Sequence, residues 1–314
     1  MTLAVLCPGQ GAQHPGMLNI AAHHHAAGEV LRAANAALCE DMGAWAADPD
    51  QRFENARAQP LVCVSQLAWW AALRERIPAP IAFAGYSVGE LAAYGVADAL
   101  NASVLARVAR ERARAMDAVA GTEPGGVIAL RGVSRTVATE LCDGKRAFIA
   151  IVIDENASVI GGTQSALDAV AESARRAGAQ VTCLRVGVAS HTPLLAAAAN
   201  EFRGSLEASP LRAPARPVVA GIDGSWVFTR ERAIDVLAEQ VARTIEWARC
   251  VDALYERGCR VFLELGPGAA LSRMVSNRLK RVEARSVDEF HHAAAVAEWV
   301  VRSVARTHRT LDHP

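Results

Sequence analysis

Residues 81–91 read IAFAGYSVGEL, and this stretch decides the fold. Its first half, 81–86, is a short apolar run of the kind that forms a buried parallel strand. Its second half opens a helix-forming stretch that we expect to cover 89–119. A serine between two glycines at a strand-to-helix turn is typical of a nucleophile elbow, which exposes the serine oxygen above a sheet. Ser87 is therefore a candidate nucleophile, and the N–H group of Val88, at the start of the helix, is placed to stabilise an oxyanion.

The same stretch also has a simpler interpretation. Ser87 is a good helix N-cap, and Glu90, three residues later, would complete a capping box. Neither residue then needs a role in catalysis. The choice between a nucleophile and a helix cap depends on whether the rest of the chain supplies a base and oxyanion donors for Ser87.

The chain on both sides of this turn alternates short apolar runs with long helix-forming stretches. Such alternation predicts an α/β fold with a short parallel sheet. We expect core strands at 3–7, 81–86, 217–222 and 260–265, and helices at 62–76, 89–119, 233–257 and 291–306.

The segment 123–188 has a different pattern. It predicts a strand at 127–131, a helix at 134–142, strands at 147–153 and 157–161, a helix at 164–178 and a strand at 181–187. This βαββαβ order is that of a ferredoxin-like subdomain. We therefore expect a discontinuous large α/β domain, 1–122 and 189–314, with a ferredoxin-like subdomain inserted at 123–188.

Composition excludes several classes of function. The 314 residues carry 33 Lys+Arg and 33 Asp+Glu, so no basic excess indicates a nucleic-acid partner. No apolar run approaches the roughly 20 residues that cross a membrane. The seven cysteines are scattered and odd in number, which is typical of a reducing compartment and predicts a cytoplasmic protein. The histidine run 23–25 has no spaced carboxylate or cysteine, so we expect solvated side chains and no metal.

A serine nucleophile needs a base, and His191 is the best placed of the nine histidines. It follows the last predicted strand of the insert, where the chain returns to the large domain. Such a junction forms the wall of a cleft. A structural histidine remains the alternative.

Arg112 is notable for its position on a predicted helix. Leu105, Val108, Ala115 and Val119 form one apolar stripe, and Arg112 lies in its middle. A buried guanidinium is costly unless it is paired, and its fork suits a bound carboxylate. A structural salt bridge with an Asp or Glu of the chain is equally consistent with the pattern.

The loop PGQGAQ at 8–13 follows the first strand. Glycines on both sides of Gln10 permit a backbone N–H group to turn toward a ligand, as a second oxyanion donor would require. A plain turn between a strand and a helix is the alternative.

Taken together, PGQGAQ, GYSVGEL, Arg112, ASH at 189–191, PVVAGID at 217–223 and LELGPG at 263–268 resemble, in the same order, the malonyl-CoA:acyl carrier protein transacylase family. The resemblance covers about residues 3–280. It implies an α/β-hydrolase-like core with a ferredoxin-like insert. It also implies malonyl-CoA as substrate, no bound cofactor, and an acyl carrier protein as the acceptor.

The resemblance also assigns roles to residues. Ser87 matches the acylated serine and His191 the general base, while Arg112 matches the arginine that binds the malonyl carboxylate. The N–H groups of Gln10 and Val88 match the oxyanion hole. The remaining two matches are the backbone carbonyl of Gln240, which orients the histidine, and a pocket-lining glutamine, Gln59.

Tyr86 departs from the family, which usually has histidine immediately before the nucleophile. GYSVGEL is more similar to the epsilon subunit of bacterial malonate decarboxylase, which loads malonyl onto the carrier subunit of that complex. We therefore expect the transacylase subunit of malonate decarboxylase. The alternative is the transacylase of fatty-acid or polyketide synthesis, which loads its own carrier protein.

Two other classes of function remain open. An α/β-hydrolase acting as an esterase or thioesterase would share the elbow and would use Asp223 with His292. A non-catalytic subunit that docks a carrier protein would need no nucleophile. Five basic residues would suit an acidic carrier, although a solvated helix explains them as well: Arg273, Arg278, Lys280, Arg281 and Arg285.

Overall fold

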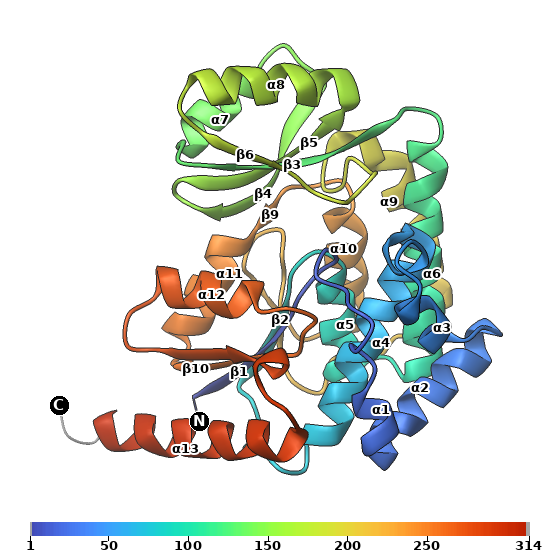
Figure 1. Ribbon diagram of the computed structural model, residues 1–314, viewed down its shortest axis with the longest axis vertical. Coiled ribbons are helices and arrows are strands. Elements are labelled where there is room, and N and C mark those ends of the chain that lie inside the picture. The colour runs from blue at the N-terminus through green and yellow to red at the C-terminus, as the bar shows by residue number, and fades with distance from the viewer. Residues whose placement is uncertain (1, 312–314) are drawn as a thin grey trace.

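The computed structural model describes residues 2–311, which form two β-sheets with helices packed around them (Figure 1). The larger sheet has six strands in the order β11-β10-β1-β2-β7-β8. Their bounds are Leu3–Cys7 (β1), Ala82–Gly85 (β2), Val218–Val219 (β7), Trp226–Val227 (β8), Val261–Glu264 (β10) and Glu283–Ser286 (β11). All neighbouring strands are parallel except β8, which is antiparallel to β7.

Strand β1 lies inside this sheet, and all five of its residues are buried. A continuous apolar run such as LAVLC is what a parallel strand covered on both faces requires. The loop that follows β1 and the turn that follows β2 leave the same edge of the sheet. The fold therefore brings residues 8–13 beside Ser87.

Helices surround the larger sheet. Their bounds are Ile20–His23 (α1), His25–Leu38 (α2), Met42–Ala47 (α3), Asn55–Leu73 (α4), Val88–Val96 (α5), Ala102–Ala120 (α6), Ala196–Ala208 (α9), Arg230–Gln240 (α10), Trp247–Glu256 (α11), Ala270–Arg278 (α12) and Ala293–Leu311 (α13). In Figure 1, α2, α4 and α6 lie side by side on one flank of the sheet, and α13 lies at the end opposite the second sheet.

The second sheet has five strands in the order β6-β3-β5-β4-β9. The predicted element order of residues 123–188 is present, with bounds Gly125–Arg131 (β3), Arg135–Cys142 (α7), Ala147–Asp154 (β4), Ala157–Thr163 (β5), Gln164–Arg176 (α8) and Gln180–Cys183 (β6). The four strands of this segment pair antiparallel. In Figure 1 the segment forms the upper part of the molecule, with α7 and α8 on the outer face.

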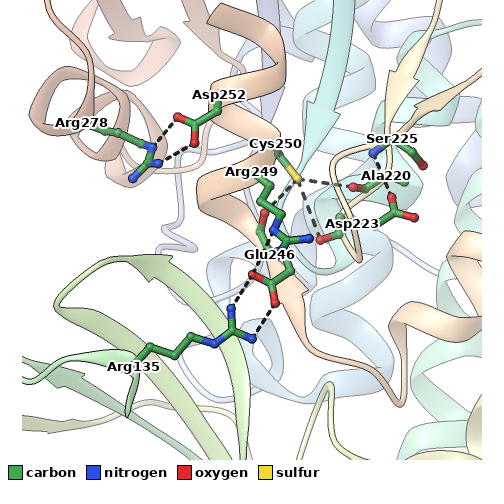
Figure 2. Close-up of polar contacts among 10 residues, drawn as sticks. Arg135, Ala220, Asp223, Ser225, Glu246, Arg249, Cys250, Asp252 and Arg278 are labelled. Carbon is green, nitrogen blue, oxygen red and sulfur yellow. Dashed lines mark hydrogen bonds and ion pairs between the residues drawn. The ribbon is translucent and has the colours of Figure 1, made fainter. Parts of the chain in front are cut away.

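The fifth strand of this sheet comes from outside the segment. Strand β9, Ile245–Glu246, pairs parallel with β4. Beside it, the Thr244 hydroxyl donates to the Ile149 carbonyl at 2.7 Å. Figure 2 shows Arg135, the first residue of α7, donating two hydrogen bonds to the Glu246 carboxylate, at 3.1 and 2.9 Å. Residues 244–246 therefore fasten the smaller sheet to the rest of the molecule.

Two predicted helices are each divided in the structure. In the stretch 89–119, one helix ends at Val96 and a second begins at Ala102. The first cannot continue through Asp98, which has a positive φ of 61°, and Asn101 caps the second by accepting from Val104 N–H at 3.0 Å. The stretch 233–257 is interrupted by β9. The predicted strand 181–187 ends at Cys183, and 217–222 contains only the two paired residues of β7.

Three further features of the described residues complete the description. No bounds were predicted for helices α1, α2, α3 and α9, and strands β8, β9 and β11 were not predicted. None of the described helices is long and apolar enough to span a membrane. The seven cysteines are free thiols.

Candidate active site

The turn between β2 and α5 holds Ser87 in an unusual conformation. Its φ of 57° and ψ of −124° are rare for a residue with a side chain, and such backbone strain is concentrated at functional sites. The turn also packs tightly, because a Cβ atom added at Gly89 would lie 2.0 Å from the Cys7 carbonyl oxygen. Val88 is the first helical residue, and the first N–H groups of a helix have no acceptor within it.

The capping-box interpretation of this turn is wrong. The Ser87 side chain makes no capping hydrogen bond. The Glu90 carboxyl instead accepts from the Gly221 N–H group at 3.0 Å and from the Gln240 side-chain amide. The Ser87 hydroxyl is thus available for another partner.

That partner is His191. Ser87 Oγ and His191 Nε2 are 2.7 Å apart, and His191 Nδ1 lies 2.6 Å from the Gln240 backbone oxygen. A carbonyl oxygen only accepts, so the proton of the neutral imidazole is on Nδ1. Nε2 therefore accepts from the serine hydroxyl, which is the arrangement that a general base needs.

The imidazole of His191 is held in a dry environment. The residue is 2% exposed, has a φ of 61°, and its N–H group donates to the Val241 carbonyl at 2.9 Å. Burial and, to a smaller extent, the positive charge of Arg112 together lower the pKa of His191 from 6.5 to about 3, against the opposing effect of the bond to Gln240. The ring is therefore neutral, and able to take a proton, throughout the neutral pH range.

Arg112 is buried beside this pair, with 1% of its surface exposed. One terminal nitrogen donates to Gln59 Oε1 at 2.8 Å and the other to Gln240 Oε1 at 3.1 Å. Burial lowers the pKa of Arg112 to about 10, against the opposing effects of Cys63 and Glu90. No ion pair of Arg112 occurs in the described part of the chain, so the expected structural salt bridge is not what holds this guanidinium.

A narrow groove leads to Ser87 and is bordered by both sheets. Its lining combines residues at the carboxyl edge of the larger sheet with apolar side chains of the smaller one: Gly9, Gln10, Tyr86, Ser87, Val127, Ala150, Ile151, Val159, Leu184, Val186, Ser190 and His191. Leu184 and Val186 belong to the irregular stretch that follows β6. Arg112 and Gln59 are not part of this lining.

The other predicted site residues divide between the groove and its support. Gln10 lines the groove on a loop that is anchored by Gln66, whose side-chain amide donates to the Pro8 carbonyl at 2.7 Å. Tyr86 lines it too, with its ring edge against Trp247 at 5.5 Å between centroids, and burial raises the pKa of its hydroxyl. Gln59 binds Arg112, and Gln240 binds both His191 and Arg112.

Sequence analysis did not identify Glu90 as part of this network. The residue has no exposed surface, and its carboxyl lies between Gly221 and Gln240. An acidic residue three positions after a serine at a helix start also fits a capping box. The contacts of the Glu90 carboxyl group with Gly221 and Gln240, which are distant in the sequence, separate the two interpretations.

The rival catalytic pair does not assemble. Asp223 accepts from Ser225 N–H at 2.8 Å and from Arg232 at 2.8 Å, and no hydrogen bond joins it to His292 among the described residues. His292 lines a separate cavity, where its Nδ1 accepts from the Ala295 N–H group at 3.1 Å.

The basic residues near the end of the larger sheet are partly neutralised. Figure 2 shows Arg278 paired with Asp252, at 2.7 and 2.5 Å. Arg285 lies 3.7 Å from Glu289 and stacks over Phe290. Two of the five residues proposed to meet an acidic carrier protein therefore already have partners within the chain.

Among the residues whose side chains the structure describes, no group of three His, Cys, Asp or Glu side chains is placed to hold a metal ion.

Comparison with known proteins identifies the family. A family model described as the acyl transferase domain matches residues 5–309. The chain belongs to this family. The acyl transferase is 29% identical over 293 residues to the malonyl CoA-acyl carrier protein transacylase of Mycobacterium bovis, covering 91% of this chain and 96% of the relative. It is 26% identical to the protein of the same name from Escherichia coli K12, covering 94% and 98%.

Solved structures agree with this placement of the acyl transferase. The malonyl-CoA:acyl carrier protein transacylase of Xanthomonas oryzae superposes with a TM-score of 0.89 at 29% identity, covering 95% of this chain and 98% of that one. The mixed α/β architecture with two sheets is thus shared with that enzyme. A serine bonded to a neutral histidine, at the N-terminus of a helix, is suited to forming and breaking an acyl ester.

Proposed function

We propose that this acyl transferase moves a malonyl group from CoA to the thiol of an acyl carrier protein, through an ester on Ser87. One observation carries the proposal: a buried arginine, bonded to two side-chain amide oxygens, lies beside a hydrogen-bonded Ser–His pair. The pair supplies the transfer chemistry, and the arginine supplies recognition of an acid. The names of the relatives support the same donor and the same class of acceptor.

In the first half-reaction, Ser87 is acylated. His191 Nε2 takes the proton from Ser87 Oγ as the oxygen attacks the thioester carbonyl carbon. The backbone N–H groups of Gln10 and Val88 donate to the oxyanion of the tetrahedral intermediate. The C–S bond then breaks, and the CoA sulfur leaves with the proton from His191. A malonyl ester remains on Ser87.

In the second half-reaction, the ester is passed to the carrier. The carrier thiol gives its proton to His191 and attacks the ester carbonyl carbon. The C–O bond to Ser87 breaks, and the proton returns from His191 to Ser87 Oγ. The Gln240 carbonyl holds the Nδ1 proton of His191 throughout and keeps the tautomer fixed, so no aspartate is needed.

Arg112 explains why the acyl group is an acid. Its guanidinium has donors beyond the two that bind Gln59 and Gln240, and the fork suits a carboxylate. Since the guanidinium is buried, an uncharged acyl group would leave it without a counter-ion. Malonyl therefore gains an interaction that acetyl lacks.

The identity of the acceptor carrier is the finer part of this proposal. The named relatives support a carrier of fatty-acid or polyketide synthesis better than the carrier subunit of malonate decarboxylase. Tyr86, directly before Ser87, is the residue on which the decarboxylase assignment depends. Acceptor kcat/KM values for the two kinds of carrier, each bearing its own thiol arm, distinguish the alternatives.

We also propose a division of the chain into two parts that together form the groove. Residues 1–122 and 189–314 make an α/β-hydrolase-like domain, and residues 123–188 make a ferredoxin-like subdomain. The βαββαβ order and the separate sheet of the segment support this division. Ser87 and His191 belong to the large domain, whereas the apolar wall that faces them belongs to the subdomain.

Intact-protein mass spectrometry after brief incubation with malonyl-CoA tests the function. We expect the mass of one malonyl group to be added to the wild-type chain, and none to a Ser87→Ala variant. Ser225→Ala is a matched control, since Ser225 lies outside the groove and should acylate normally. A Ser87→Ala protein that is still malonylated would contradict the proposal.

The same experiment separates the rival functions. Release of CoA with accumulation of free malonate, and no acceptor present, would indicate a hydrolase. Absence of both adduct and CoA release would indicate a docking subunit or a different acyl donor.

A further inference from the structure

Glu90 is a buried carboxyl group for which the transfer mechanism has no use. It lies in the first turn of α5 with no exposed surface. Its Oε2 accepts from Gly221 N–H and from Gln240, whereas Oε1 has no hydrogen-bond partner among the described residues. Burial raises the pKa of this carboxyl to about 8, against the opposing effects of Gln240, Gly221 and Arg112. Burial of such a group is costly, so its position requires an explanation.

The contacts of Gln240 supply that explanation. Its side-chain Oε1 accepts from Arg112 at 3.1 Å, and its Nε2 donates to Glu90 and, at 3.2 Å, to the Ser87 carbonyl. Its backbone oxygen accepts from His191. One residue thus contacts the arginine, the elbow and the base. A side-chain amide has one accepting and one donating end, so the direction in which it points decides what Arg112 meets.

We propose that Glu90 is a positioning residue for the malonyl carboxylate, because it holds the Gln240 amide with its oxygen toward Arg112. This inference rests on the proposed function. A flipped amide would present N–H groups to the guanidinium, which also only donates. Arg112 would then lose one of the two hydrogen bonds that orient it. Glu90 Oε2 accepts from the amide whether or not the carboxyl group is protonated, so it binds the donating end of the amide and disfavours the flipped state.

The arrangement also leaves Arg112 free for substrate. A carboxylate paired directly with the guanidinium would occupy the fork that a malonyl group must use. Glu90 instead contacts Arg112 through the Gln240 amide. The fork of Arg112 is thereby left open for the malonyl carboxylate.

Gly221 provides an independent way to disturb Glu90. A Cβ atom added at Gly221 would lie 2.6 Å from Glu90 Oε2 and 3.5 Å from Gln240 Nε2. The carboxyl group reaches its place only because residue 221 has no side chain. Gly221→Ala therefore displaces Glu90 without altering its chemistry.

The test compares malonyl-CoA with acetyl-CoA as donors. For Glu90→Ala we expect the KM of malonyl-CoA to rise about tenfold, the effect of one misdirected hydrogen bond to a charged group, with acetyl transfer within about twofold of wild type. Glu90→Gln keeps an accepting oxygen toward Gly221 and Gln240, so it should restore the malonyl KM to within about threefold of wild type. Gly221→Ala should shift the malonyl/acetyl ratio in the same direction as Glu90→Ala.

Each other outcome overturns the inference. Equal losses with both donors would mean that Glu90 only supports the packing of the elbow. An unchanged donor ratio in Glu90→Ala would mean that the Gln240 amide is fixed without it. If Glu90→Ala does not fold, an unchanged ratio in Gly221→Ala decides against the inference in the same way. A wild-type enzyme with no preference for malonyl-CoA would instead refute the proposed function, and the inference with it.

Discussion

The groove at Ser87 and the cavity beside His14 both contain histidine, yet they differ in size and in how the histidine nitrogens are bonded. The cavity measures about 650 Å³ and is lined by His14, His23, His24, His291 and His292. The groove measures about 60 Å³ and contains His191 alone of the histidines. Judged by volume and by the number of titratable groups, the cavity would be the better candidate for an active site.

The hydrogen bonds of the histidine nitrogens favour the groove as the active site. Both ring nitrogens of His191 have a partner, and the Gln240 carbonyl at Nδ1 fixes Nε2 as the nitrogen that accepts from Ser87. In the cavity, His14 Nε2 lies 3.1 Å from Asp288, whereas the buried Nδ1 atom of His24 has no partner among the described residues. The comparison teaches that a catalytic histidine is recognised by what holds it in place, rather than by how many histidines are near.

Arg112→Ala has the largest expected effect, and it tests whether the groove is the site that recognises malonyl. Loss of a buried contact between a charge pair costs about 2–5 kcal/mol, so kcat/KM for malonyl-CoA should fall by roughly 30- to 5,000-fold. Acetyl transfer should change far less, because acetyl has no carboxylate. Arg107→Ala, on the same helix α6, is the matched control. A variant that loses both donors equally would show that Arg112 only supports the fold.

The pH dependence of acylation tests the state of His191. A base with a pKa of about 3 stays neutral over the range in which an ordinary histidine gains its proton. We therefore expect kcat/KM for acetyl-CoA to change by less than about twofold between about pH 7 and about pH 5, with no limb near 6.5. Because Arg112 contributes to the lowered pKa, the acid limb should move upward in Arg112→Ala. A limb near 6.5 in the wild type would contradict a dry, neutral base.

The smallest expected effect belongs to the cavity. A His24→Asn, His292→Asn double variant removes two of its five histidines but touches none of the groove residues. Malonyl transfer should stay within about twofold of wild type, as for other substitutions away from buried networks. A loss greater than about tenfold, in a variant that unfolds at the wild-type temperature, would give the cavity a role in the reaction and weaken the comparison.

Sequence patterns predicted most of what local physics controls. The apolar run 3–7 became β1 with the same bounds, because a run of five apolar residues that ends at Pro8 and Gly9 is typical of a strand covered on both faces. The apolar stripe on the predicted helix correctly indicated that Arg112 is buried. The turn at Ser87 has the strained conformation and close packing that its flanking glycines indicate.

Contacts between distant segments were harder to predict. Strand β9 has only two residues, and pairing with β4, nearly a hundred positions earlier, is what makes them a strand. The break between α5 and α6 does have a local cause, the Asn101 cap, which was overlooked within a long helix-forming stretch. The position of Glu90 depends on Gly221 and Gln240, and no local pattern reports either contact.

The pairing of β9 with β4 limits how freely this enzyme can be rebuilt. Residues 123–188 look like an exchangeable module, yet their sheet is completed by Ile245 and Glu246, which follow Gln240 by only a few residues. A grafted segment from a relative would have to match the register of β9 with β4 and the Arg135–Glu246 pair. A mismatch would displace the Gln240 carbonyl, which orients His191. Chimeras that carry residues 241–246 together with the inserted segment should therefore keep their transferase rate better than chimeras cut at 123 and 188 alone.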